Sequence, residues 1–156
     1  MAAVEIAIDD LASPEIIELL QAHVSEMRRV TPQEESVHAL DLDGLRRPEV
    51  TFWSLRDGDA IAGCGAIKRL DSTHAEIKSM RTSDAYKRRG VAARLLEHIE
   101  AEAVRMGFTR LSLETGAEEF FAPARALYLR CGFEYCEPFG NYLPDPLSVF
   151  MTKKVA

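Results

Sequence analysis

The chain has 156 residues and a formal net charge of -6, with 47% hydrophobic and 28% charged residues. This composition is typical of a globular protein, so we expect one domain over residues 1–156. The acidic balance argues against a nucleic-acid partner. No basic segment opens the chain and no apolar run approaches the roughly 20 residues that cross a bilayer, so we expect neither a secretory signal nor a membrane partner.

Three cysteines, Cys64, Cys131 and Cys136, form an odd number and lack the C-x-x-C spacing of a zinc or redox site. The sequence therefore predicts no metal site. Without a secretory signal, free thiols in a reducing cytoplasm are the expected state, because disulfides form mainly in oxidising compartments.

Strand and helix patterns alternate from the beginning of the chain. Val4–Ile8 alternates as a short strand, and Ser13-Pro14 then begins a helix that runs to about Arg29, with serine as N-cap. Thr31-Pro32-Gln33-Glu34 repeats this start signal and predicts a second helical piece. On the first helix, His23 lies on the apolar side and is expected in the core or facing a substrate.

A hairpin is expected next. The segments Val50–Arg56 and Ala60–Leu70 have strand patterns on either side of the turn Asp57-Gly58-Asp59. Gly63 and Gly65 weaken the second strand or allow a bulge in it.

The segment from Thr73 to Met106 contains the strongest functional signal. It predicts a strand over Thr73–Arg81 and an amphipathic helix from Val91, joined by the basic loop Lys87-Arg88-Arg89-Gly90. A glycine at a helix start lets a ligand approach the backbone, and the free N–H groups and the helix dipole favour an anion. With Arg94, the loop places four cations in an acidic chain, so it is either a phosphate site or a solvated basic turn.

Four elements are predicted after this helix: a strand over Arg110–Thr115, a helix over Pro123–Arg130, a strand over Phe133–Tyr135 and a closing strand over Ser148–Lys154. Residues 137–147 hold three prolines and follow neither period, so we expect an ordered loop that forms a lid or a binding wall. The order β-α-α-β-β-β-α-β-α-β-β indicates an α+β fold with a mixed sheet.

The segment AEIKSMRTSDAYKRRGVAARLL resembles motif A of the GNAT superfamily of acyl-CoA-dependent N-acetyltransferases, whose phosphate loop reads Gln/Arg-x-x-Gly-x-Gly/Ala. Lys87 takes the first position, which keeps the positive charge but loses the planar fork of arginine. The resemblance implies acetyl-CoA as cosubstrate and a phosphate loop made of Lys87, Arg88, Arg89, Gly90, Val91 and Ala92.

The segment ALYLRCGF, from Ala126 to Phe133, resembles a second element of the same family, L-Y-x-x-x-G-F. It implies that Tyr128 lies near the thioester sulfur and protonates the leaving thiolate as general acid, the alternative being a half-buried aromatic residue. Two motifs in this order imply the GNAT fold over essentially the whole chain. That fold has a mixed, mostly antiparallel sheet of about seven strands, with helices on both faces.

The family geometry also implies that the motif A strand and the strand after it splay apart. Backbone groups of Met80, Arg81 and Thr82 would then pair with the pantetheine arm, and one N–H would polarise the thioester carbonyl.

The acceptor amine must be neutral to attack, so a base or a water relay is needed. Glu76 matches the strand glutamate that often serves as base in the family, and Glu114 and His38 are its rivals. A structural ion pair with Lys78 is the alternative for Glu76.

In this family the acceptor is selected by the regions that correspond here to about 27–47 and 137–147. We expect Met27, Tyr142 and Asp145 to contact the acceptor. The segments SVHALDLDGL and PLSVFMTKK, together with the second region, resemble a YsnE-like branch of bacterial acetyltransferases.

The resemblance implies direct acetyl transfer to a small-molecule amine in a ternary complex. Dimers are frequent among relatives, which leaves a homodimer open, but the sequence alone gives no oligomeric state. A non-catalytic acyl-CoA-binding or sensing module is the first alternative; it would need neither Tyr128 nor a base. A protein- or peptide-modifying acetyltransferase is the second, and an open groove around Tyr142 would support it.

Overall fold

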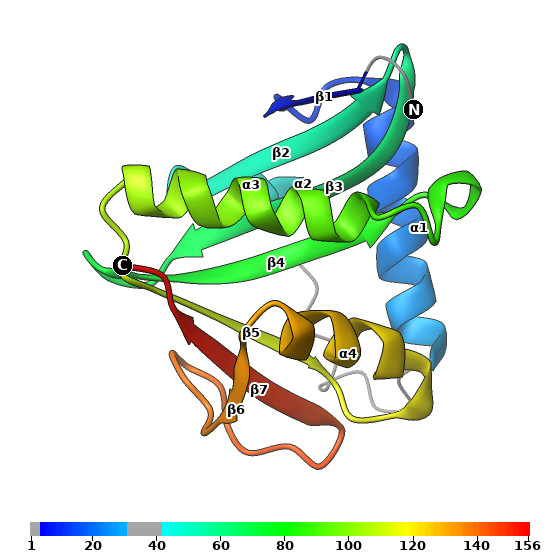
Figure 1. Ribbon diagram of the computed structural model, residues 1–156. Coiled ribbons are helices and arrows are strands. Elements are labelled where there is room, and N and C mark those ends of the chain that lie inside the picture. The colour runs from blue at the N-terminus through cyan, green and yellow to red at the C-terminus, as the bar shows by residue number, and fades with distance from the viewer. Residues whose placement is uncertain (1–3, 31–41) are drawn as a thin grey trace.

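The computed structural model describes residues 4–30 and 42–156. The expected α+β class is confirmed, since one mixed sheet of seven strands carries helices on both faces (Figure 1). In chain order the elements are β1 (Val4–Ile8), α1 (Pro14–Val30), α2 (Leu42–Leu45), β2 (Val50–Asp57), β3 (Ala60–Arg69), β4 (His74–Thr82), η2 (Asp84–Tyr86), α3 (Val91–Arg105), β5 (Arg110–Gly116), η3 (Glu119–Phe121), α4 (Ala122–Arg130), β6 (Glu134–Cys136) and β7 (Ser148–Lys154).

The strands lie in the order β1-β2-β3-β4-β5-β7-β6, and β4–β5 is the single parallel pair among them. These two strands pair over three residues, from His74 opposite Arg110 to Glu76 opposite Ser112. Beyond Glu76 they diverge, as the ribbons in Figure 1 show. The splay expected from the family geometry is therefore present, and it leaves the β5-facing edge of β4 unpaired by β5.

A bulge bends β4 within this splayed part. Ala66 of β3 pairs with Lys78, whereas Cys64 pairs with Arg81, so β4 holds one extra residue. Ser79 adopts a left-handed φ of 57°, and its carbonyl accepts a hydrogen bond from the Cys64 thiol at 3.3 Å. A non-glycine residue in this conformation is uncommon and marks a segment held in place by its surroundings.

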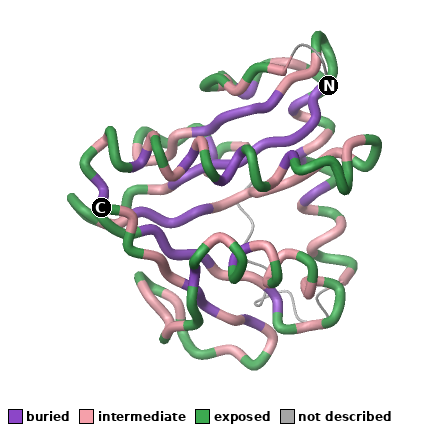
Figure 2. The backbone as a smooth tube through the Cα atoms, in the orientation of Figure 1, coloured by how far each residue is buried: buried purple, intermediate pink, exposed green. Residues whose placement is uncertain are grey.

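Helix α3 covers one face of β2, β3 and β4, and two glycines of β3 let it lie close. A Cβ atom at Gly63 would stand 2.8 Å from Val91 Cγ1, and one at Gly65 would stand 2.9 Å from Ile99 Cδ1. Such distances leave no room for a larger residue. Buried side chains accordingly concentrate along the central strands and the inner side of α3 (Figure 2).

Helix α1 covers the opposite face of the sheet. Ile16 and Leu20 are buried against Phe52, Cys64 and other apolar residues of β2 and β3. Helix α4 lies on the same side of the sheet as α3, over β5 and β7 (Figure 1). The splay between β4 and β5 thus opens between α3 and α4 on one face and towards α1 on the other.

Most predicted boundaries agree with the structure within one or two residues. The short 3-10 helices η2 and η3 were not predicted, and most of the second helical piece expected after Thr31 lies outside the described residues. All three cysteines are free thiols, and Cys64 is buried. No helix within the described ranges is long and apolar enough to cross a membrane.

Candidate active site

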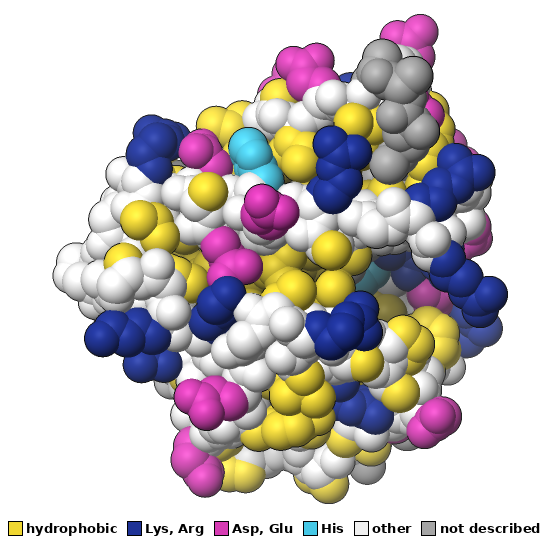
Figure 3. All heavy atoms as spheres, viewed as in Figure 1, with side chains coloured by type: hydrophobic (Ala, Val, Ile, Leu, Met, Phe, Trp, Pro, Cys, Tyr) yellow, Lys and Arg dark blue, Asp and Glu magenta, His cyan; other side chains and the backbone are white. Residues whose placement is uncertain are grey.

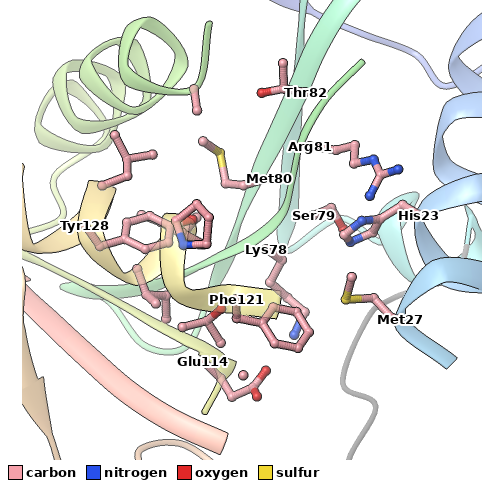
Figure 4. A pocket seen from close by; sticks show the side chains of 18 of the residues that line it. His23, Met27, Lys78, Ser79, Met80, Arg81, Thr82, Glu114, Phe121 and Tyr128 are labelled. Atoms are coloured by element: carbon pink, nitrogen blue, oxygen red, sulfur yellow. The ribbon is translucent and has the colours of Figure 1, made fainter. Parts of the chain in front are cut away.

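A cavity of about 540 Å³ lies where β4 and β5 diverge. Figure 3 shows a hollow on this face with Lys and Arg side chains around it, and Figure 4 shows the lining from close by. Its walls come from α1, β4, the beginning of α3, β5, η3, α4 and the loop before β7. The predicted site residues among the lining are Met27, Glu76, Met80, Arg81, Thr82, Lys87, Arg88, Ala92, Glu114, Tyr128 and Tyr142.

The α3 end of this cavity has the geometry of an anion site. Gly90 precedes the helix with a φ of 78°, and no atom lies within 4 Å of the position a Cβ would take. The backbone there is open to a ligand, and the first N–H groups of α3 have no partner inside the helix. Lys87 lies 3.0 Å from the Asp84 carboxylate, but both side chains are more than half exposed, so this ion pair is weak.

Arg89 and Val91 adjoin Gly90 at the α3 end of the cavity but do not line the cavity. The Arg89 guanidinium lies 5.3 Å from the centre of the Tyr86 ring, and the Tyr86 hydroxyl donates to Asp57 at 2.9 Å. These contacts fasten the loop to the end of β2. Val91 is buried in the core with Leu55, so only its backbone is available to a ligand.

Tyr128 lines the cavity from α4, on the side opposite α1. Its side chain is buried, and its ring packs edge-on against Phe133 at 5.6 Å between centroids. Its hydroxyl has no hydrogen-bond partner among the described residues. Burial raises the pKa of the phenol, so the hydroxyl is protonated at neutral pH and has a proton to give.

Glu76 and Lys78 form a buried polar group with Tyr142 on the α1 side of the sheet. The Lys78 ammonium donates to Glu76 and to the Tyr142 hydroxyl, each at 3.1 Å, and that hydroxyl donates to Glu76 at 2.5 Å. Burial, together with the Glu76 carboxylate, raises the pKa of Tyr142. The ion pair weighed as the alternative for Glu76 is therefore present in the structure.

Tyr142 also holds the loop of residues 137–147 against the sheet. Its ring lies 5.2 Å from that of Phe139 and 5.4 Å from that of Phe150, and Phe139 also meets His74. This loop is thus a packed wall of the cavity. Asp145 belongs to the wall but does not line the cavity; its carboxylate accepts the Leu147 N–H at 2.8 Å.

Glu114 faces the cavity from β5, level with Lys78. Its carboxylate accepts a hydrogen bond from the Ser148 hydroxyl at 2.8 Å. Burial raises the pKa of Glu114 to about 7, and the negative charge of Glu76 adds to this, whereas Ser148 and Lys78 oppose it. A carboxyl with a pKa near 7 exchanges protons readily at neutral pH.

A third cluster of polar side chains comes from α1 and the β4 bulge, and the sequence analysis did not predict that these residues lie together. The Arg81 guanidinium donates to Glu26 at 2.5 Å and holds the pKa of that carboxyl below its usual range. His23 is buried beside them, and burial, reinforced by the charge of Arg81, lowers its pKa to about 4. The only hint of this cluster in the sequence was His23, which lies on the apolar side of its predicted helix. His38 lies outside the described residues.

Residues 15–133 match the Acetyltransferase (GNAT) family. The chain is 55% identical over 150 residues to the uncharacterized N-acetyltransferase YsnE of Bacillus subtilis (strain 168), which covers 96% of this chain and 99% of that protein.

Two solved structures share the fold. An acyl-CoA N-acyltransferase from Klebsiella pneumoniae has a TM-score of 0.83 and 29% identity, with both chains covered completely. A GNAT acetyltransferase from Elizabethkingia anophelis with acetyl-CoA bound has a TM-score of 0.71 and 17% identity, with 99% of each chain covered. The family match covers most of the chain, and the splayed sheet and glycine loop agree with it. This chain therefore belongs to the GNAT family of acetyltransferases.

Proposed function

We propose that the protein transfers an acetyl group from acetyl-CoA to a primary amine of a small molecule, directly and within a ternary complex. The observation that carries this proposal is that one cavity is lined by the phosphate loop, by Tyr128 and by Glu114. Helices α3 and α4 lie on one face of the sheet and α1 on the other, so donor and acceptor have separate approaches to the splay. Both substrates fit at once, and no acyl-enzyme is required.

The donor end suits coenzyme A. The open backbone at Gly90, together with Lys87 and Arg88, offers N–H groups and positive charge to phosphates. The unpaired edge of β4 offers backbone hydrogen bonds to the pantetheine arm. The Elizabethkingia structure holds acetyl-CoA on the same fold, which supports acetyl-CoA as the donor here.

The reaction needs one bond formed, one broken and two proton transfers. The amine nitrogen attacks the thioester carbonyl carbon, and the carbon–sulfur bond breaks. A backbone N–H near Met80 stabilises the oxyanion, Glu114 takes the proton that the amine loses, and Tyr128 protonates the departing thiolate. The phenol is protonated at neutral pH and so carries the proton that this last step needs.

Glu114 is a better base than Glu76. Glu76 Oε2 is already bound to the ammonium of Lys78 and the hydroxyl of Tyr142, so a proton from the amine would have to displace both. Glu114 has one hydroxyl partner, and its pKa of about 7 matches the working pH of a general base. We propose that Glu76 instead positions Lys78 and, through Tyr142, the wall formed by the loop of residues 137–147 (the loop wall).

The acceptor side favours a small molecule over a protein chain. The loop wall is held inward by Tyr142, and Phe121 and Met27 add apolar surface around the same space. Figure 4 shows Phe121 next to Glu114 and Met27 further towards α1. An acceptor site walled by this loop and by apolar side chains suits a small amine better than a folded partner.

Calorimetric titration with acetyl-CoA, followed by thiol release with a panel of primary amines, tests this proposal. We expect micromolar binding of acetyl-CoA and turnover of one amine class. Binding without turnover across amino acids, polyamines and peptides would favour a sensing module instead. No binding would refute the donor site.

A further inference from the structure

Three buried polar atoms on the α1 side of the cavity have no hydrogen-bond partner within the part of the chain that the structure describes. They are His23 Nδ1, Ser79 Oγ and Arg81 Nε. All three residues line the cavity, and Figure 4 shows them on its α1 side, across from Tyr128. Orphaned atoms of this kind are rare in folded proteins, so three in one place call for a physical cause.

These unsatisfied atoms do not stabilise the fold. Leaving a buried donor or acceptor unsatisfied costs about 1–3 kcal/mol. A leucine at position 23 would suit the apolar side of α1, where Ile16 and Leu20 are already buried, without that cost. A protein tolerates such a loss mainly where a ligand supplies the missing partner.

The chemistry of the three atoms defines the group that would satisfy them. Arg81 Nε–H is a donor, the Ser79 hydroxyl can donate, and His23 is a neutral imidazole that can present an N–H at Nδ1. A carbonyl-type oxygen is a group that can accept a hydrogen bond from any of the three. An ammonium or a second amine would instead face the Arg81 guanidinium and be repelled.

The register of the sheet gives the offset between Arg81 and the level of Glu114, where the amine reacts. Glu76 pairs with Ser112, so Lys78 and Glu114 stand at one level along the diverging strands. Arg81 stands two β3 residues further on, because Ala66 pairs with Lys78 and Cys64 with Arg81. At about 3.3 Å per residue the separation along the strand is about 7 Å.

We infer that His23, Ser79 and Arg81 form the subsite for a carboxylate or amide oxygen of the acceptor, offset from its reacting amine by about 7 Å along the strand direction. The acceptor class is then an amino acid or short amide with its amine at the far end of an extended chain. A rotation of the His23 ring admits the oxygen, as is common for side chains at binding sites. This inference rests on the proposed function, since it takes Glu114 as the place of the amine.

Three acceptors of equal chain length test the subsite: δ-aminovalerate, its carboxamide and n-pentylamine. We expect kcat/KM for the first two to exceed that for n-pentylamine by at least about 10-fold. Preference for the carboxylate would identify a free acid, and equal use of the amide would identify an amide-bearing acceptor. Equal kcat/KM for all three would overturn the subsite.

Variants separate a ligand site from a structural one. His23→Leu and Ser79→Ala should each reduce the preference over n-pentylamine towards unity and leave the Kd for acetyl-CoA unchanged. His23→Leu should also raise Tm by about 2–4 °C, because it removes an unsatisfied buried group. The matched control is His98→Leu on α3, which lies outside the cavity and should keep the preference. A lower Tm with an unchanged preference in His23→Leu would show a purely structural histidine.

Calorimetric binding of the same three compounds in the presence of coenzyme A distinguishes the two ways of failing. If no compound is acetylated but δ-aminovalerate still binds more tightly than n-pentylamine, the subsite stands and the proposed transfer fails. If all are acetylated without preference, the transfer stands and the subsite fails.

Discussion

The two ends of the cavity are built in different ways. The donor end consists of nearly contiguous residues, from η2 through the glycine loop into α3, and its ligand groups are largely backbone. The acceptor end is gathered from α1, β4, β5 and the loop before β7, and its groups are side chains. Unsatisfied atoms and the pKa of Glu114 shifted to about 7 occur at the acceptor end. The proposed donor site is therefore a local motif, whereas the proposed selection and deprotonation of the acceptor depend on tertiary contacts.

The largest effect is expected from a charge at the donor end. Gly90→Asp places a carboxylate beside the phosphate site, where like charges about 4 Å apart repel by about 4 kcal/mol at an effective dielectric of 20. Affinity for acetyl-CoA should fall by about 1000-fold in calorimetric titration. Gly90→Asn is the matched control, because asparagine has the same shape and also tolerates the φ of 78°. Equal affinities in the two variants would refute an anion site at this loop.

The next largest effect is expected at the point where the two ends meet. Tyr128→Phe keeps the ring that packs on Phe133 and removes a hydroxyl that has no partner in residues 4–30 and 42–156, so folding should be unaffected. Turnover should drop by about 100- to 1000-fold as the general acid is lost, with little change in the Kd for acetyl-CoA. Thiol-release assays measure turnover, and calorimetry measures the Kd for acetyl-CoA. Normal turnover would remove Tyr128 from the mechanism.

At the acceptor end, the pH profile identifies the base. Because the pKa of Glu114 is raised to about 7, the carboxyl is protonated below that pH, and kcat/KM for the amine should rise as pH increases through about 7. Glu114→Gln should lower kcat/KM by about 100-fold at pH near 8 and remove this ascending limb. An unchanged limb in that variant would assign the titration to another group.

The same raised pKa has a consequence for stability. The folded state binds the Glu114 proton more tightly than the unfolded state, whose carboxyl titrates near 4.5. The contribution of Glu114 to the free energy of unfolding therefore decreases as pH rises from about 4.5 to about 7. Glu114→Gln should be less affected over this range in denaturant titrations.

The smallest effect is expected from Glu76→Gln. Glutamine can still accept from Tyr142, so kcat/KM should fall by less than about 10-fold and the ascending pH limb near 7 should remain. The expected change is a higher KM for the amine with kcat less affected, since Glu76 positions Lys78 and the loop wall. Loss of the limb in Glu76→Gln, but not in Glu114→Gln, would return the base role to Glu76.

The sequence by itself determined the local parts of this protein. The periodicity of residues 91–105, the glycine before them and the Ala126–Phe133 segment were sufficient to predict helices α3 and α4, the glycine loop before α3 and the place of Tyr128 on α4. This is because helix periodicity, helix starts and left-handed glycines depend on neighbours in the chain.

Only the tertiary structure gave a reason to propose Glu114 rather than Glu76 as the base. The pKa of Glu114 reflects burial between strands, and the partners of Glu76 include Tyr142, which is 66 residues away in the chain. Desolvation and long-range hydrogen bonds are properties of the packed chain and leave no local pattern. The same holds for the orphaned atoms of His23, Ser79 and Arg81, which come together because a bulge in β4 faces α1.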